Sequence, residues 1–263
     1  MSDQSRPVEP DGLHLYPPAG TRMLVVGGCG GIGRVLVQAA MSAGLEVAVM
    51  DLQRSIGAAK PPAGVRAIPL DVTDPESVNA AFADLTYSWD GFGVLVNLAG
   101  YATERIPVEQ LTAEQWDEVV AVSLRGTYLV ARRALRMIRQ AGGGSIIHTA
   151  SGLATNVMPG YGPYSAAKAG VIALTKALAR ENAPTIRANA IAPGAVDTEF
   201  LTGGTGRPRQ TPQIDLESYV KSIPMGRIAQ AADIVGPIMF LAGPASRFVS
   251  GQTLYINGAA LTP

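Results

Sequence analysis

The stretch Met23-Leu-Val-Val-Gly-Gly-Cys-Gly-Gly-Ile-Gly33 joins a short apolar run to a glycine cluster, and a helical pattern then continues to Ala43. The apolar run predicts a buried strand, and the glycines permit a tight turn from that strand into the helix. A backbone that turns this closely can approach a pyrophosphate, which the positive N-terminal end of the helix attracts. The stretch therefore predicts a dinucleotide-binding turn, with Gly27, Gly31, Ile32 and Gly33 against the ligand.

An acidic residue follows the second predicted strand. Residues Glu46–Met50 form that strand, and Asp51 comes directly after it. A carboxylate there can accept hydrogen bonds from both hydroxyls of an adenosine ribose, and it would repel a 2′-phosphate. The nearby basic residues are Arg34 and Arg54. The charges therefore favour NAD over NADP as the cofactor, although Asp51 also fits a cap after the strand.

The rest of the chain continues the alternation of strands and helices. Further strands are predicted at Val65–Leu70, Val94–Val96, Gly144–His148, Arg187–Ile191 and Thr253–Ile256, and helices from about Asp74, at Ala113–Gln140, at Tyr161–Asn182 and at Ala231–Leu241. Nearly continuous apolar strands between helices indicate an α/β fold with a parallel sheet covered on both faces. Asp71 and Val72 directly follow the third strand, where they could adjoin an adenine; Asp71 equally fits a cap.

The composition narrows the class of protein. The chain has 263 residues, of which 47% are hydrophobic and 16% charged, so one large α/β domain is expected. Lys plus Arg equals Asp plus Glu at 21 each, which argues against a nucleic-acid partner. One cysteine and two histidines favour neither a disulfide framework nor a metal site. No run approaches the length of a membrane span, so we expect a soluble cytoplasmic protein.

Two segments differ from the rest in composition. Residues 1–20 are polar, contain four prolines, and lack the basic start and apolar run of a signal peptide. They are predicted to be a flexible or surface-draped extension before a single domain at 21–263. Residues 199–226 are interrupted by glycines and prolines, and they predict a mobile loop over a site.

Tyr164 and Lys168 lie four residues apart in Tyr-Ser-Ala-Ala-Lys, with Ser151 upstream. On a helix these two side chains share one face. A neighbouring ammonium favours the phenolate form of tyrosine, and a hydroxyl can orient a substrate oxygen between them. The trio predicts a site that moves a proton, whereas the Tyr/Lys spacing alone is common on amphipathic helices.

With these motifs in their order, residues 22–258 resemble the short-chain dehydrogenase/reductase superfamily, in its branch of about 250-residue enzymes. Gly27, Gly31 and Gly33 match its glycine motif. The matching segments further along the chain are Asn97-Leu-Ala-Gly100, the Ser151, Tyr164 and Lys168 trio, Pro193-Gly-Ala-Val-Asp-Thr198 and Gly251-Gln-Thr-Leu-Tyr-Ile-Asn-Gly258. The resemblance implies a Rossmann-type, doubly wound parallel sheet in a three-layer α/β/α domain.

The resemblance also implies an activity: an NAD(P)-dependent enzyme that acts on the CH–OH group of a secondary alcohol or on the corresponding ketone. Tyr164 would be the general acid/base, Lys168 would lower its pKa and bind the nicotinamide ribose, and Ser151 would hold the substrate oxygen. Further cofactor contacts would come from Asn97, Ala99, Gly100, Pro193, Gly194, Val196 and Thr198. Family habit suggests a homotetramer.

Three residues depart from the family pattern. Val26 replaces the threonine of the glycine motif, and Leu98 replaces the second asparagine of Asn-Asn-Ala-Gly. Ser123 stands where the family has an asparagine that holds a water next to the lysine, so the proton relay is expected to be altered. Ser123 is the best support for an alternative function, a dinucleotide-binding sensor or scaffold without turnover. An isomerase, dehydratase or dehalogenase of this fold is disfavoured because the trio and Thr198 are present.

The expected substrate pocket has mostly apolar walls. They are Leu153, Met158, Tyr161, Tyr101, Ala102 and residues 199–222. Few fixed charges among them favour a small neutral alcohol or ketone. His148 is interpreted as a packed, hydrogen-bonded strand residue, and Cys29 as a small loop residue.

Overall fold

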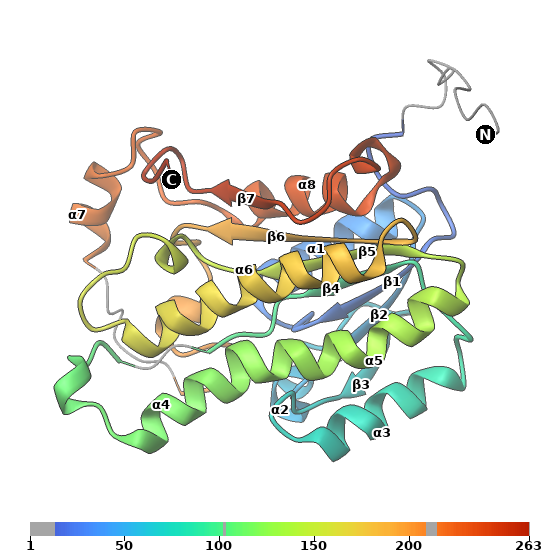
Figure 1. Ribbon diagram of the computed structural model, residues 1–263, viewed down its shortest axis with the longest axis horizontal. Helices are drawn as coiled ribbons and strands as arrows, with labels where there is room; N and C mark the ends of the chain where they lie inside the picture. Colours follow the sequence, from blue (N-terminus) through green and yellow to red (C-terminus); the bar gives the residue numbers. More distant parts are fainter. Residues whose placement is uncertain (1–13, 102–103, 209–214, 263) are drawn as a thin grey trace.

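In the computed structural model, which describes residues 14–101, 104–208 and 215–262, seven parallel strands form one sheet (Figure 1). Their order is β3-β2-β1-β4-β5-β6-β7. The strands are β1 (Arg22–Val26), β2 (Glu46–Asp51), β3 (Arg66–Pro69), β4 (Val94–Asn97), β5 (Gly144–Thr149), β6 (Ile186–Pro193) and β7 (Thr253–Ile256). The predicted doubly wound parallel sheet in a single α/β/α domain is confirmed.

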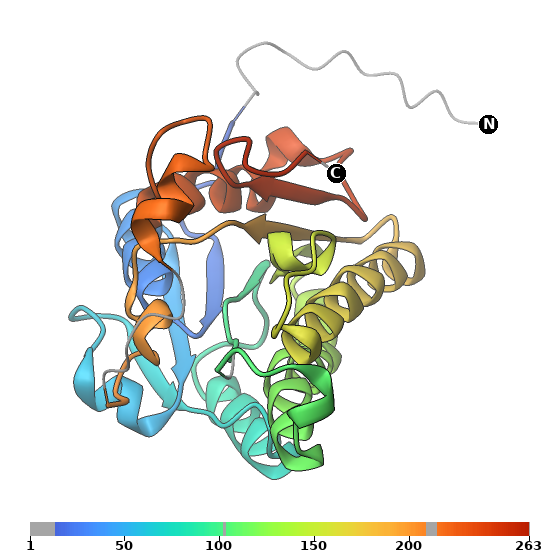
Figure 2. The same ribbon diagram turned by 90° about the vertical axis from the view of Figure 1, so that its left-hand side faces the viewer.

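Helices cover both faces of the sheet, as the end-on view in Figure 2 shows. One face carries α3 (Pro75–Thr86), α5 (Gly126–Gln140) and α6 (Gly162–Asn182), and the other carries α1 (Gly31–Ser42) and α8 (Ala231–Ala242). In β1, Leu24 packs into the first core, while Met23 and Val25 pack into the second. Burial of both faces explains why the strand is apolar throughout and does not alternate.

The direction of winding reverses between β1 and β4. From β1 the chain moves outward through β2 and β3, then returns to β4 on the other side of β1 and continues to β7. The last registered pair between β1 and β4 is Val26 with Asn97. A crevice opens beyond the carboxyl ends of strands at such a reversal, which is where ligands bind in sheets of this kind.

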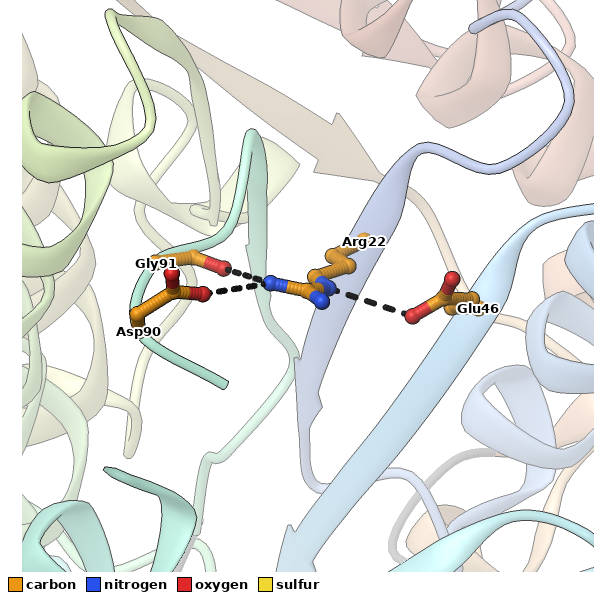
Figure 3. Close-up of polar contacts among 4 residues, drawn as sticks. All are labelled: Arg22, Glu46, Asp90 and Gly91. Carbon is orange, nitrogen blue, oxygen red and sulfur yellow. Dashed lines mark hydrogen bonds and ion pairs between the residues drawn. The ribbon is translucent and has the colours of Figure 1, made fainter. Parts of the chain in front are cut away.

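The opposite end of β1 is held by Arg22 (Figure 3). Its guanidinium lies 3.1 Å from Glu46 on β2 and 2.8 Å from Asp90 before β4, and it donates to the carbonyl of Gly91 at 3.3 Å. Both acids are largely exposed, so each ion pair adds little to stability. These contacts join three neighbouring segments at the amino ends of the strands, away from the crevice.

Most helix boundaries follow local signals. Asp74 accepts a hydrogen bond from the Glu76 N–H at 2.9 Å and Pro75 occupies the first turn of α3, so this helix begins where the sequence predicted it, at about Asp74. The expected single helix at Ala113–Gln140 is instead α4 (Ala113–Val120), a π-helical turn (Ala121–Arg125) and α5. A π-helical turn adds about one residue to a single helical turn, which hardly changes the apolar pattern. The sequence therefore did not reveal the π-helical turn between α4 and α5.

Short elements were not predicted. They are α2 (Gln53–Ala58) after β2 and α7 (Leu216–Lys221) within the expected loop at 199–226. Residues 209–214 of that loop lie outside the described residues. The described part of the expected extension lies on the domain, because the Ala245 N–H donates to the His14 carbonyl at 3.2 Å and the Gly20 N–H to the Gly44 carbonyl at 2.8 Å. Within the described ranges, no helix is long and apolar enough to cross a membrane.

Candidate functional site

The glycine turn between β1 and α1 is packed too closely for side chains. Gly27 has φ of +80°, and a Cβ there would lie 3.0 Å from the Ala99 N atom. A Cβ on Gly33 would lie 2.4 Å from the Gly27 carbonyl oxygen. Helix α1 begins at Gly31, and its N-cap Gly30 provides no side-chain cap. The turn thus brings a helix N-terminus that has no side-chain cap to the cavity through Gly27, Gly30 and Gly31, which fits a pyrophosphate.

Asp51 lies at the carboxyl end of β2 and is partly buried. Its Oδ2 accepts from the Cys29 N–H at 2.9 Å, and its Oδ1 accepts from the Leu52 N–H at 2.8 Å. Burial raises the pKa of Asp51, and these two hydrogen bonds oppose the rise. Each carboxylate oxygen keeps further lone-pair capacity toward the crevice. The residue is therefore fixed in place and can still accept ribose hydroxyls.

A cavity of about 970 Å³ joins the two halves of the predicted site. The predicted site residues that line it are Gly27, Gly31, Asp51, Asp71, Val72, Ala99, Gly100, Ser151, Tyr164, Pro193 and Gly194. Six other predicted residues are described but do not line the cavity: Ile32, Gly33, Asn97, Lys168, Val196 and Thr198. Thr198 nevertheless contacts the glycine turn, because its Cγ2 would lie 2.5 Å from a Cβ on Gly31.

Tyr164 and Ser151 face the cavity from α6 and from the end of β5. Burial raises the pKa of Tyr164 to about 12, although a hydrogen bond with Ser151 opposes the rise. The Lys168 Nζ lies 5.7 Å from the centre of the Tyr164 ring. The expectation that Lys168 lowers the pKa of Tyr164 is therefore not met by the protein alone, because loss of water outweighs any charge effect at this distance.

Lys168 is buried, with 2% of its surface exposed. Its Nζ donates to the Thr149 carbonyl at 2.7 Å, and it would lie 3.3 Å from a Cβ on Gly100. Burial lowers the pKa of Lys168 to about 8. A lysine that shares a face with Tyr164 and titrates near neutral pH is suited to proton exchange.

Ser123 lies in the π-helical turn and is fully buried. Its Oγ accepts from the Tyr101 N–H at 3.2 Å and donates to the Tyr101 carbonyl at 3.1 Å. The Ser123 carbonyl accepts from the Thr127 hydroxyl at 2.9 Å. The side chain therefore fixes the loop that follows β4, and Tyr101 of that loop lines the cavity.

Asp71 and Asn97 each use an oxygen locally. Asp71 Oδ1 accepts from the N–H and hydroxyl of Thr73, at 2.9 and 2.7 Å, which is a turn-forming role. Asn97 Oδ1 accepts from the Ala99 N–H at 3.1 Å and shapes the turn after β4. Asp71 also lines the cavity.

The substrate side of the cavity contains the predicted Leu153, Met158, Tyr161 and Tyr101, while Ala102 lies outside the described residues. Charged residues also line the cavity, namely Glu104, Arg105, Glu118, Arg207 and Asp215. The Arg207 guanidinium stacks over Tyr101 at 4.4 Å from the ring centre. The expectation of few fixed charges was therefore wrong, because charged residues from segments far apart in the sequence meet at this cavity.

Several contacts made by the segment after β6 could not be predicted from the sequence. The Ser55 hydroxyl donates to the Thr205 carbonyl at 3.1 Å, and the Tyr219 hydroxyl accepts from the Ala195 N–H at 3.1 Å. Phe200 lies 6.4 Å from Tyr164 between ring centres. Only the glycine- and proline-rich composition of 199–226 pointed to this region.

Cys29 and His148 are both buried. Burial raises the pKa of the Cys29 thiol to about 12, which leaves it unreactive near neutral pH. The His148 Nδ1 lies 3.0 Å from the Thr175 hydroxyl. In the part of the chain that is described, no three His, Cys, Asp or Glu residues cluster as metal ligands would.

Comparisons with known proteins agree with this geometry. Residues 27–259 match the protein family described as Enoyl-(Acyl carrier protein) reductase. The chain is 30% identical over 243 residues to the 3-oxoacyl-(acyl-carrier-protein) reductase FabG of Aquifex aeolicus, covering 89% of this chain and 95% of that protein. It is 33% identical to the D-threitol dehydrogenase of Mycolicibacterium smegmatis, covering 89% and 90%.

A solved structure resembles the whole domain. The 3-ketoacyl-(acyl-carrier-protein) reductase from Brucella melitensis, complexed with NADH, superimposes with a TM-score of 0.84 at 27% identity. The match covers 92% of this chain and 98% of that one. Sequence, sheet order and the arrangement of the glycine turn and the Ser151, Tyr164 and Lys168 trio lead to one conclusion: the chain belongs to the short-chain dehydrogenase/reductase superfamily, a family of oxidoreductases.

Proposed function

We propose that this protein is an NAD-dependent oxidoreductase that interconverts a secondary alcohol and a ketone, acting on the CH–OH group. One observation carries the proposal. Ser151 and Tyr164 line the same cavity as the glycine turn and Asp51, and the Lys168 Nζ lies 5.7 Å from the centre of the Tyr164 ring. A dinucleotide bound along the turn would place its reactive end near these side chains.

Each residue has a distinct task in this proposal. Ser151 holds the substrate oxygen, and Tyr164 donates or removes the proton on that oxygen. Lys168 exchanges the proton beyond Tyr164 and stabilises the phenolate through its charge. The bound dinucleotide supplies or accepts the hydride. Burial disfavours the phenolate in the protein alone, so the positive charge of Lys168 matters most when Tyr164 loses its proton.

Asp51 supports NAD as the preferred cofactor. Its carboxylate lines the cavity where the adenosine ribose would lie, and two backbone N–H groups fix its orientation. A 2′-phosphate would meet this negative charge in a partly buried site, where repulsion is poorly screened. The relative from Brucella melitensis is described as complexed with NADH, which is consistent with this preference.

The substrate side supports a small-molecule alcohol or ketone. Leu153, Met158 and Phe200 provide apolar contact near Tyr164, and we propose a neutral reacting group between them. We further propose that the enzyme acts in the cytoplasm as a homotetramer.

NADH formation with a panel of secondary alcohols tests the proposal, with Tyr164→Phe and Tyr87→Phe compared with the unaltered protein. Tyr87 is 86% exposed, so its variant is a matched substitution away from the cavity. Activity that falls at least about 10²-fold in Tyr164→Phe alone is the expected result. Tight NAD binding without turnover, unaffected by Tyr164→Phe, would instead indicate a dinucleotide sensor or scaffold.

A further inference from the structure

Two buried polar atoms on neighbouring strands lack a protein partner. Among the described residues, Asn97 Nδ2 and His148 Nε2 have no hydrogen-bond partner, and the residues are 2% and 0% exposed. A buried polar group without a partner costs free energy, and in native proteins such groups are usually satisfied by bound water. Both atoms therefore indicate a ligand site that the mechanism above does not use.

The two residues are neighbours on one face of the sheet. Asn97 of β4 and His148 of β5 are registered partners in a parallel pair. Neighbouring strands lie about 4.8 Å apart, and the two side chains point to the same side of the sheet. That side is covered by α5 and α6, because Leu95 and Ile146, two residues earlier on each strand, pack in the core with those helices. Neither residue is among those that line the cavity.

The hydrogen bonds around His148 fix its tautomer. The Thr175 hydroxyl has one proton and donates it to the Val171 carbonyl at 2.7 Å. It must therefore accept from His148 Nδ1, which lies 3.0 Å away. The neutral ring then has its proton on Nδ1 and a free lone pair on Nε2. Asn97 Nδ2 is a donor, so a water molecule can accept from Asn97 and donate to His148.

Lys168 is close to the same place. Its Nζ donates to the carbonyl of Thr149, the residue after His148, and the Thr149 hydroxyl donates to the Asn97 carbonyl at 2.9 Å. The charge of Lys168 also contributes to the lowered pKa of His148, after burial. An ammonium has three N–H donors, and the Thr149 carbonyl satisfies one of them.

We propose that Asn97 Nδ2 and His148 Nε2 bind one water molecule beneath Lys168, and that this water gives the Lys168 ammonium a second hydrogen-bond acceptor. The water donates one proton to His148 and accepts from Asn97, which leaves a lone pair for Lys168. His148 is thus a positioning residue, because it acts on the reaction only through Lys168. The water site stands on its own, whereas its effect on turnover rests on the proposed function.

Other charges near Lys168 are few. In the described part of the chain, the titratable groups that face it are Tyr164 from the same helix and His148 from β5. The polar side chains on β4 and in the π-helical turn, Asn97 and Ser123, are neutral. A change at His148 that leaves its charge at zero near pH 8 should therefore reach Lys168 through hydrogen bonding alone.

A high-resolution crystal structure of the protein tests the site directly. We expect an ordered water within hydrogen-bond distance of both Asn97 Nδ2 and His148 Nε2. A direct hydrogen bond between these two atoms, or a dry gap, would overturn the proposal. This result is independent of turnover, so it separates failure of the water site from failure of the proposed function.

The pH profile of kcat tests the effect on Lys168. His148→Leu removes the acceptor, which disfavours the charged lysine and should move the alkaline limb about one unit toward lower pH. His148→Gln, which keeps an acceptor, should leave the alkaline limb close to its position in the unaltered protein. Ser165→Ala is the control, because Ser165 Oγ is another buried atom without a partner on α6. An alkaline limb that is the same in the unaltered protein and His148→Leu would overturn the proposal.

Discussion

Arg34 Nη2 lies 2.5 Å from Glu199 Oε1, so an ion pair joins the first turns of α1 to the segment that follows β6. Arg34 also donates to the Cys29 carbonyl within the glycine turn at 2.9 Å. The pair is half exposed, with side chains 40% and 47% accessible, and it adds little to global stability. Its position matters more, because it holds the segment at the place where a pyrophosphate would bind.

Arg34→Gln should weaken NAD binding about two- to fivefold, which corresponds to roughly 0.4 to 1 kcal/mol. The substitution releases the segment and leaves the Glu199 carboxylate without its cation beside the pyrophosphate site. Titration of NADH fluorescence measures the Kd. Lys221→Gln, which breaks the exposed pair with Glu217, is the matched control and should leave the Kd unchanged. An equal Kd for Arg34→Gln and the unaltered protein would contradict the prediction.

Asp51 should determine the choice of cofactor. The unaltered protein is expected to prefer NAD by at least about tenfold in kcat/KM, and Asp51→Ser should reduce this ratio by about tenfold because the repulsion of a 2′-phosphate is lost. Asp71→Ser removes a carboxylate elsewhere in the same cavity and should change both cofactors alike. A tenfold preference of the unaltered protein for NADP would show that Asp51 does not act in this way.

The parallel sheet was predictable because its central strands, such as β1 and β4, are apolar on both faces. The start of α3 was predictable because Asp74 and Pro75 mark it. Tyr164 and Lys168 could also be placed together, because residues four positions apart on a helix such as α6 share one face. Contacts between distant residues had no such signal. Ser55 of α2 and Thr205 are separated by 150 positions, and nothing in the sequence indicates that the segment around Thr205 would pack against α2.

The pKa of Tyr164 could not be predicted from its neighbours in the sequence. The presence of Lys168 suggested a lowered value, but burial raises the pKa to about 12. The Phe200 ring, which comes from a different part of the chain, lies 6.4 Å from the Tyr164 ring, and the sequence did not reveal this packing. In the same way, Ser123 was recognisable as a departure from the family, while its partner Tyr101 was not.

Ser123→Ala should impair substrate binding more than the chemical step. The substitution removes both hydrogen bonds to Tyr101 and leaves a backbone N–H and carbonyl without that partner, which should cost about 1 to 3 kcal/mol of stability. Because Tyr101 lines the cavity, KM should rise several-fold while kcat changes little. Steady-state kinetics and thermal unfolding measure the two effects. A large loss of kcat at constant KM would place Ser123 in the proton relay instead.

Lys168 should produce an alkaline limb in the activity profile near pH 8. Burial lowers its pKa to about 8, so the ammonium is present below that pH and is lost above it. Lys168→Arg keeps a positive charge at every pH of interest, so its lower activity should lack this limb. Measurements of kcat from pH 6 to pH 10 test the point. A limb of unchanged position in Lys168→Arg would assign it to another group.

His148 should make the folded state sensitive to mild acid. Burial, with a smaller effect of Lys168, lowers the pKa of His148 from 6.5 to about 4. The unfolded state therefore binds a proton that the folded state excludes between these values, so the stability that His148 contributes is complete above pH 6.5 and is lost as the pH falls toward 4. Urea unfolding should show the free energy of unfolding falling by about 2 kcal/mol more between pH 7 and pH 5 in the unaltered protein than in His148→Gln. His14→Gln, at an exposed histidine, should behave as the unaltered protein does. Equal losses in all three proteins would mean that His148 becomes protonated without unfolding, which its complete burial and neutral partner Thr175 argue against.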